Sequence, residues 1–279
     1  MPLNSSTLHP CGESKLERME LLVRRNYSKK IWDEQPVFSF TSDIDWASEE
    51  VMKSYFEIVN KLEIQPTLYI THQSDEIEHN FREKNIVRGL HPNFMNESSH
   101  GNSFKEIAEN CIKFAPEAYG FRSHRAFDLT DITHLMHNKY GFKHVSHQIT
   151  IFQPYVRPIV HESGLVNFPV FFEDGTHLYN QLNLNFGTYK DLFTIPGIKV
   201  ISFHPMNFVF NSPELSFMRA IKDSVSRDEY NRITSETIKK LRNEKIGIRD
   251  TVLEIVEFVK THNYSILSMN DLYNTYLEG

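Results

Sequence analysis

The sequence predicts an α/β fold, a closed or nearly closed (β/α) barrel formed by one domain. Short apolar runs alternate with amphipathic helical segments along most of the chain, and this alternation is typical of a parallel sheet. The length of 279 residues is ordinary for a barrel domain. No internal repeat and no Pro/Gly-rich linker divides the chain. An open, doubly wound sheet is the alternative that this pattern leaves open.

The expected elements follow one another in the order that this fold requires. An amphipathic helix at 14–31 forms most of an N-terminal extension, residues 1–35, which precedes the barrel domain at 36–279. The expected strands are 37–41, 67–71, 86–90, 119–122, 143–151, 168–172, 198–203 and 264–269. The expected helices are 47–62, 103–114 with Ser103 as N-cap, 129–140 stopped by Gly141, 247–262 and a short C-terminal helix.

Composition and charge exclude several classes of protein. Hydrophobic residues make up 40% of the chain, and the net charge is −6, so we expect no nucleic-acid partner, which would require a basic stripe. No segment approaches the roughly 18 apolar residues of a membrane span. Residues 1–35 lack the apolar core of a signal peptide, and Cys11 and Cys111 form no metal-binding or redox pair. We therefore expect a cytoplasmic protein without a membrane span.

Titratable side chains stand at the C-terminal ends of four expected strands. These side chains are Asp43 and Asp45, His91, Arg122 and His124, and His204. A parallel barrel gathers the C-terminal ends of its strands on one rim, where active sites lie. The sequence therefore predicts that these groups converge in space.

The residue types at these strand ends favour a metal site. Two carboxylates as close as Asp43 and Asp45 raise each other's proton affinity unless a cation is nearby. His91 and His100 flank one loop, and neutral imidazole is a good ligand for zinc. Two histidines with one carboxylate form a recurring catalytic zinc set. The alternatives are structural: Asp45 could cap the following helix, and the histidines and Arg122 could be packing or surface residues.

Five short motifs, taken in order, resemble the signature blocks of the polysaccharide deacetylases (the NodB-homology group, carbohydrate esterase family 4). The motifs are FTSDIDW at 40–46, GLHPNF with SSHG at 89–101, GFRSH at 120–124, FFEDGTH at 171–177 and SFHPMNF at 202–208. The match looks closest to the divergent WbmS-type branch. The resemblance implies a single-domain, distorted (β/α)7 barrel and one divalent metal ion, commonly zinc, with cobalt, nickel or manganese as alternatives.

The resemblance also implies roles for individual residues. Asp43 is then the catalytic base, steadied by Arg122, and His204 is the catalytic acid, tuned by Asp174 or alternatively Glu173. The implied metal ligands are Asp45, His91 and His100, with His72 as an alternative to His100, because the family's histidine pair is closer together. The candidate substrate-binding residues are Asn93, His124 and Asn207.

The function that follows is removal of an N-acetyl or related acyl group from an amino sugar. Its expected partner is an N-acylated amino sugar, free or linked to a nucleotide or lipid, in surface-polysaccharide synthesis. One alternative is a glycosyltransferase that uses Asp43 and Asp45 as a metal-binding Asp-x-Asp motif. Another is a non-catalytic barrel that binds a glycan or a metal.

Overall fold

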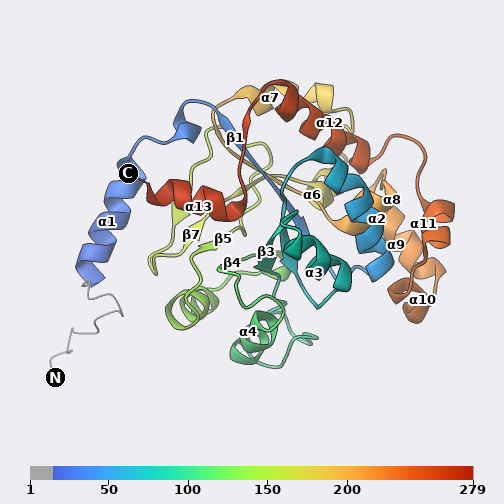
Figure 1. Ribbon diagram of the computed structural model, residues 1–279, viewed down its shortest axis with the longest axis horizontal. Coiled ribbons are helices and arrows are strands. Elements are labelled where there is room, and N and C mark those ends of the chain that lie inside the picture. The colour runs from blue at the N-terminus through green and yellow to red at the C-terminus, as the bar shows by residue number, and fades with distance from the viewer. Residues whose placement is uncertain (1–14, 279) are drawn as a thin grey trace.

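The computed structural model describes residues 15–278, and its centre is a curled sheet surrounded by helices (Figure 1). Cys11 and the first residue of the expected N-terminal helix lie outside the described residues. The strands are β1 (Pro36–Asp43), β2 (Thr67–Ile70), β3 (Val87–Leu90), β4 (Gly120–Phe121), β5 (His144–Val145), β6 (Ile159–Val160), β7 (Val166–Asn167), β8 (Val170–Glu173), β9 (Gly197–Ser202) and β10 (Ser265–Ile266).

The sheet has the parallel order expected of a barrel. Its strands run in the order β6-β7-β5-β4-β3-β2-β1-β9-β8, and β10 pairs with β1. Every pairing is parallel except that of β6 with β7. An isolated parallel bridge joins Ile149, just after β5, to Val170 at the start of β8. The sheet therefore curls back on itself, and the expected single-domain (β/α) barrel architecture is confirmed.

The helices agree with the expected pattern where the periodicity is long. They are α1 (Lys15–Tyr27), α2 (Glu49–Val59), α3 (Asp75–Arg82), α4 (Phe104–Ile112), α5 (Thr130–His134), α6 (Asp174–Tyr179), α7 (Lys190–Thr194), α8 (Pro205–Phe210), α9 (Leu215–Ser224), α10 (Arg227–Asn231), α11 (Ser235–Leu241), α12 (Ile248–Thr261) and α13 (Met269–Leu277). Ser103 caps α4 by accepting a hydrogen bond from the backbone N–H of Glu106. The helix begun by α5 continues as a π-helical turn, Leu135–Lys139, and Gly141 follows with a positive φ of 76°.

The two ends of the described chain lie side by side. Helix α1 lies against α13 (Figure 1), where Tyr276 donates a hydrogen bond to the side chain of Asn26 over 3.2 Å. Leu22 is buried in the same apolar cluster as Leu272. Burial of these apolar side chains stabilises the contact between α1 and α13.

Strand β1 positions the first candidate residues. All eight residues of β1 are buried, and its ladder with β9 pairs Pro36 through Thr41 with Gly197 through Ser202. Asp43 therefore leaves the sheet at the C-terminal rim. Helix α2 is capped by Ser48, which accepts a hydrogen bond from Val51, so Asp45 does not cap it.

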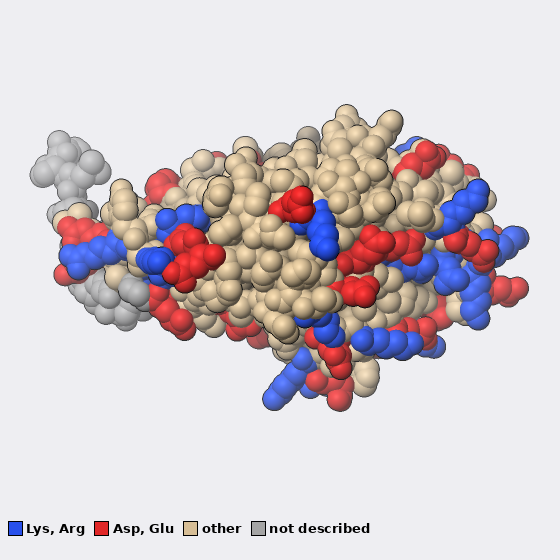
Figure 2. Space-filling view, turned by 90° about the horizontal axis from the view of Figure 1, so that it is seen from above, with Lys and Arg blue, Asp and Glu red and all other residues tan. Residues whose placement is uncertain are grey.

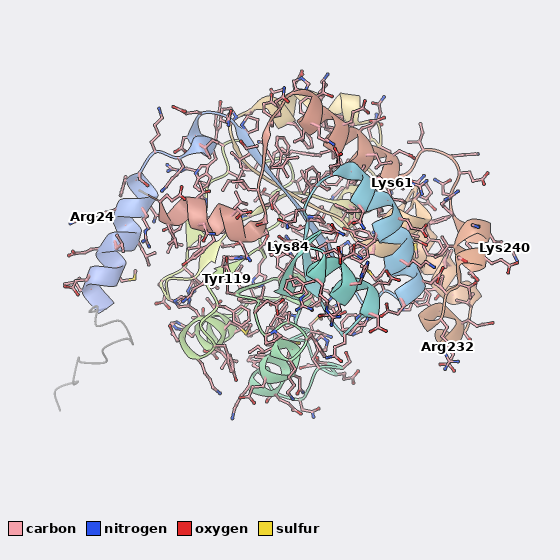
Figure 3. The ribbon with its side chains drawn as sticks, viewed as in Figure 1. Arg24, Lys61, Lys84, Tyr119, Arg232 and Lys240 are labelled. Atoms are coloured by element: carbon pink, nitrogen blue, oxygen red, sulfur yellow. The ribbon has the colours of Figure 1, made fainter. Side chains whose placement is uncertain are left out.

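The surface of the molecule mixes charges of both signs. On the face shown in Figure 2, Lys and Arg lie among Asp and Glu at both ends, and the middle is largely uncharged. Figure 3 places Arg232 and Lys240 at the outer edge, on the group of helices α9 to α11. Within residues 15–278, no helix is long and apolar enough to cross a membrane.

Lys199 gives a first prediction, on stability. This β9 side chain is fully buried, its amine lies 4.0 Å from the centre of the Phe171 ring, and it has no hydrogen-bond partner among the described residues. Burial lowers the pKa of the Lys199 amine from 10.5 to about 8. Between these values the unfolded chain binds more protons than the folded protein, so stability rises with pH there.

We therefore expect Lys199→Met to raise the free energy of unfolding at pH 7 by about 1–3 kcal/mol, because it removes the cost of burying the charged amine. Denaturant unfolding at pH 7 and pH 9.5 would measure this change, with the exposed Lys61→Met as control. A variant less stable than the parent at pH 7 would contradict the prediction.

Candidate active site

The candidate residues line one pocket at the C-terminal ends of the strands. The pocket has a volume of about 400 Å³. It receives Asp43 and Asp45 from the end of β1, His91 from β3, Arg122 and His124 from β4, and His204 from β9. The structure therefore brings together groups from four strand ends, at the rim where barrel enzymes place their chemistry.

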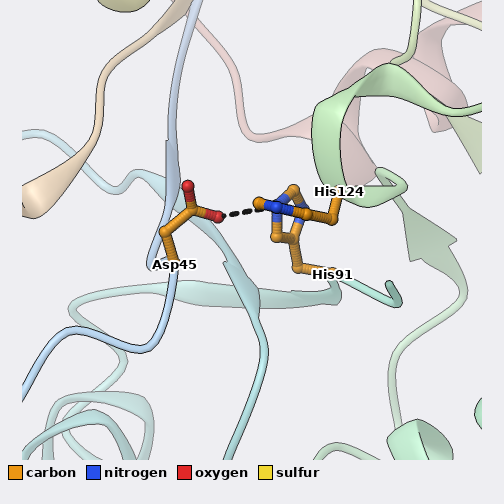
Figure 4. A group of neighbouring side chains, drawn as sticks. All are labelled: Asp45, His91 and His124. Atoms are coloured by element: carbon orange, nitrogen blue, oxygen red, sulfur yellow. Dashed lines mark hydrogen bonds and ion pairs between the residues drawn. The ribbon is translucent and has the colours of Figure 1, made fainter. Parts of the chain in front are cut away.

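Three of these side chains form a compact group of potential metal ligands: Asp45, His91 and His124 (Figure 4). Oδ1 of Asp45 lies 3.1 Å from Nε2 of His91 and 3.1 Å from Nδ1 of His124. The two histidine nitrogens are 3.4 Å apart. This donor set of two imidazoles and one carboxylate fits a divalent cation such as zinc.

The electrostatics around Asp45 favour its charged form. Burial alone would raise the pKa of this carboxyl, but hydrogen bonds from His124 and His91 and the charge of His204 hold it well below its usual range. Asp45 and Trp46 both have left-handed backbone, with φ of 41° and 56°. Such residues carry strain of order 1–3 kcal/mol each and cluster at functional sites.

His100 does not join this group, which differs from the ligand set expected from sequence. Its Nδ1 accepts a hydrogen bond from the backbone N–H of Asn93 over 3.1 Å, and its Nε2 lies 2.8 Å from the carbonyl oxygen of Thr71. A neutral imidazole has one donor and one acceptor nitrogen, and both are used here. In this structure His124, and not His100, lies beside Asp45 and His91.

The alternative ligand His72 is also outside the group. Its Nδ1 lies 2.9 Å from the hydroxyl of Thr71, and it does not line the pocket.

Arg122 holds Asp43 inside the barrel. Its Nη1 donates to Oδ1 of Asp43 over 2.8 Å, and the same nitrogen reaches the hydroxyls of Thr41 and Ser202. Nε and Nη2 donate to the backbone oxygen and hydroxyl of Ser146. The guanidinium thus links β4 to β1, β5 and β9. A buried guanidinium requires hydrogen-bond partners of this kind. Because the guanidinium is held by several partners, its hydrogen bond also fixes the position of the Asp43 carboxylate.

His204 and Asp174 form a second tightly bonded pair. Nδ1 of His204 donates to Asp174 over 2.6 Å, and the His204 backbone N–H donates to the other carboxylate oxygen over 2.8 Å. Burial would lower the pKa of His204, but the Asp174 carboxylate, with Asp45 and Glu173, raises it well above 6.5. Nε2 of His204 lies 3.7 Å from Asp45, so this nitrogen faces the pocket.

Glu173 lies beside this pair and has a local structural role. Its carboxylate accepts hydrogen bonds from the backbone N–H groups of Gly175 and Thr176 and so caps α6. Burial and the neighbouring Asp174 raise the pKa of Glu173. Asp174 makes the shorter contact to His204, which favours Asp174 over Glu173 as the group that orients the ring.

Two residues expected to bind substrate have structural partners instead. The amide nitrogen of Asn207 donates to Asp174 over 3.1 Å, and its oxygen accepts from Ser212 over 3.0 Å. The side-chain oxygen of Asn93 accepts from the backbone N–H of Met95 over 3.1 Å. Neither side chain lines the pocket. Asn207 supports Asp174, and Asn93 closes a turn.

The Asp174–His204 pair gives a second prediction, on pH dependence. The raised pKa of His204 contributes stability below about pH 6.5 that is lost as pH rises through its folded pKa. The lowered pKa of Asp174 contributes stability above about pH 3.8 that is lost as pH falls. We therefore expect Asp174→Asn to cost about 2–3 kcal/mol of stability, most strongly between these two values.

The same substitution should move the pKa of His204 back towards 6.5, because the charge that raises it is removed. An NMR titration of the imidazole in the parent and in Asp174→Asn would measure this shift, with Asn207→Ala as a variant that keeps the charge. An unchanged titration of His204 would contradict this account.

Sequence reasoning assigned His124 to substrate binding and did not place it beside Asp45 and His91. The signal in the sequence was its position two residues beyond Arg122, after the same expected strand. The ring of Trp46 packs against both His100 and His124, with ring centres 5.4 Å and 5.2 Å away. Trp46 therefore separates a structural histidine from a potential ligand.

Comparisons with known proteins agree with this fold. A family model described as WbmS-like polysaccharide deacetylase matches residues 40–222, more than half of the chain. WbmS from Bordetella bronchiseptica, described as a polysaccharide deacetylase involved in O-antigen biosynthesis, is similar in structure, with a TM-score of 0.69 and 22% sequence identity over 79% of this chain and 89% of that chain. No sequence among the curated proteins matches.

More distant structures share less. A family 4 carbohydrate esterase from Bacillus anthracis has a TM-score of 0.46 and 10% identity over 99% of this chain and 100% of that chain. A family 4 pseudoenzyme from the same organism has a TM-score of 0.42 and 11% identity over 86% of this chain and 66% of that chain. The extent of the family match shows that this chain belongs to the WbmS-like polysaccharide deacetylases.

Proposed function

We propose that this protein is a metal-dependent N-deacetylase that acts on an N-acylated amino sugar, free or linked to a nucleotide or lipid. The observation that carries the proposal is that one pocket combines the potential ligands Asp45, His91 and His124 with two further bonded pairs. The Arg122–Asp43 pair offers a base and the Asp174–His204 pair offers an acid. The family assignment favours this hydrolase over a glycosyltransferase.

A divalent metal ion held by Asp45, His91 and His124 would polarise the acyl carbonyl and lower the pKa of water at the site. The donor set suits zinc, with cobalt, nickel and manganese as alternatives. His100 is not a ligand in this proposal, because both of its ring nitrogens already bond to the backbone.

Asp43 takes the proton of the attacking water in the proposed reaction. Its Oδ1 is occupied by Arg122, which leaves Oδ2 as the oxygen that can accept a proton. Four hydrogen bonds to other partners fix the guanidinium, and its fifth hydrogen bond holds the Asp43 carboxylate. General-base catalysis by a positioned group contributes about 10²–10⁴-fold in rate.

His204 gives its proton to the leaving amine. Its Nδ1 is bonded to Asp174, so the proton on Nε2 is the one that faces the pocket. The Asp174 carboxylate raises the pKa of His204 above its ordinary value and so favours the protonated ring. Acetate and a free amino sugar would leave the site.

An acetate-release screen tests the proposal. The purified protein would be stripped, loaded separately with zinc, cobalt, nickel or manganese, and offered N-acetylated amino sugars, sugar phosphates and nucleotide sugars. We expect metal-dependent release of acetate from at least one compound. Stoichiometric metal binding without acetate from any of them would support the non-catalytic alternative instead.

A further inference from the structure

Arg125 is unusual among the charged groups of the pocket, because it has no partner. Arg122 is paired with Asp43 at 2.8 Å, and His204 with Asp174 at 2.6 Å. Arg125 lines the same pocket and is exposed. Within residues 15–278 it makes no ion pair, hydrogen bond or ring contact.

The backbone at Arg125 is held in an unfavourable conformation. Arg125 and Ala126 are consecutive non-glycine residues in the left-handed region, with φ of 56° and 52°. The turn is closed by hydrogen bonds from Ala126 to Ser123 over 2.9 Å and from Phe127 to His124 over 3.3 Å. The backbone N–H of Ser123 is in turn bound by His147 over 2.8 Å. The turn that directs His124 towards Asp45 therefore also sets the position of Arg125.

The pairing of the other charged groups leaves Arg125 available to an anionic ligand. Asp43 is paired with Arg122. The carboxylates of Asp174 and Glu173 accept hydrogen bonds from backbone N–H groups and lie beside the His204 ring. No carboxylate among the described residues meets the Arg125 guanidinium, although the chain as a whole has a net charge of −6. A guanidinium offers paired donors that match a carboxylate or a phosphate.

We propose that the sugar substrate carries an anionic oxygen group, a phosphate or a carboxylate, and that Arg125 binds this group. The inference rests on the proposed deacetylase function, since it names the chemical class of substrate for the same pocket. Arg125 is then a specificity-determining residue rather than a catalytic one.

Three compounds with the same N-acetyl group separate the possible sources of the anion: N-acetylglucosamine, its 1-phosphate and its 6-carboxylate. Equilibrium binding would be measured by calorimetry on metal-free and metal-loaded protein, and acetate release on the loaded protein. The proteins compared are the parent, Arg125→Gln and Arg125→Lys. The control is Arg82→Gln, since Arg82 lies on α3, pairs with Glu78 and does not line the pocket.

We expect the parent to bind one of the anionic compounds about 10–100-fold more tightly than the neutral sugar, the range expected for charged hydrogen bonds. Arg125→Gln should abolish this preference and leave binding of the neutral sugar and the metal content unchanged. Arg125→Lys should keep part of the preference, because it keeps the charge but not the paired donors. Arg82→Gln should behave as the parent.

A parent that binds none of the three, or that does not prefer an anionic compound, would overturn the inference. So would a preference that survives in Arg125→Gln. Acetate release without a preference that depends on Arg125 would support the deacetylase proposal and overturn the role of Arg125. A preference that depends on Arg125, without acetate release from any compound, would support anion binding by Arg125 and count against the deacetylase proposal.

Discussion

Replacing Asp43 with asparagine is expected to lower turnover by about 10²–10⁴-fold and to leave the metal content unchanged. The substituted side chain cannot accept the proton of the attacking water, but its oxygen can still accept the hydrogen bond from Arg122 that the carboxylate now accepts over 2.8 Å. Asp43 is not part of the compact ligand group, so metal binding should not depend on it. Steady-state acetate release and elemental analysis measure the two quantities.

Loss of the negative charge leaves Arg122 buried without its counter-charge, and breaking such a pair can cost about 3–5 kcal/mol. Thermal unfolding of Asp43→Asn therefore has to accompany the activity, which is expressed per folded molecule. Asp75→Asn, at an exposed position in the first turn of α3, controls for the chemical change alone. Turnover at the parent rate in Asp43→Asn would exclude Asp43 as the base.

His124→Ala and His100→Ala are expected to give opposite results for metal binding. His124 lies within 3.4 Å of the nearest ligand atoms of Asp45 and His91. Its removal should weaken metal affinity by more than the roughly 10–100-fold that follows loss of an outer-sphere partner. Asp45→Asn and His91→Ala should lose metal similarly. Elemental analysis after dialysis and competition with a chelator would measure the affinities.

His100→Ala should retain its metal and lose stability instead. It would leave the backbone N–H of Asn93 and the carbonyl of Thr71 without their present partners, at about 1–3 kcal/mol for each buried group. Thermal unfolding gives this loss. Metal that is lost from His100→Ala and retained by His124→Ala would reverse the proposed assignment.

The core of the barrel could be predicted because its periodicity is strong. The amphipathic pattern of 247–262 becomes α12, Ile248–Thr261, and the apolar run at 198–203 becomes β9, Gly197–Ser202. The expected strand at 168–172 largely corresponds to β8, Val170–Glu173, whereas the hairpin of β6 and β7, which ends at Asn167, was not among the expected elements. Two-residue strands carry too little pattern to be seen.

The site was predictable in part, for a related reason. Asp43, His91 and His204 leave regular strands, so their direction follows from the parallel sheet. His100 lies inside the loop 91–103, whose path depends on backbone hydrogen bonds and on the Trp46 ring. The left-handed turn that directs His124 is formed by ordinary residues, Arg125 and Ala126, and no glycine marks it in the sequence.

The sheet is closed by few contacts, and these do not involve the strand that carries Asp43. Two backbone hydrogen bonds tie Val170 to the opposite edge, from Val170 to Gln148 over 2.7 Å and from Thr150 to Val170 over 2.9 Å. Ile149 and Val170 line the pocket. Asp43, in contrast, ends β1, which pairs with β9 from Pro36 to Thr41 and with β2 from Thr41 to Asp43. We therefore expect changes of side-chain size at Ile149 to alter the shape of the pocket, and with it the selectivity of the proposed reaction, while Asp43 keeps its position.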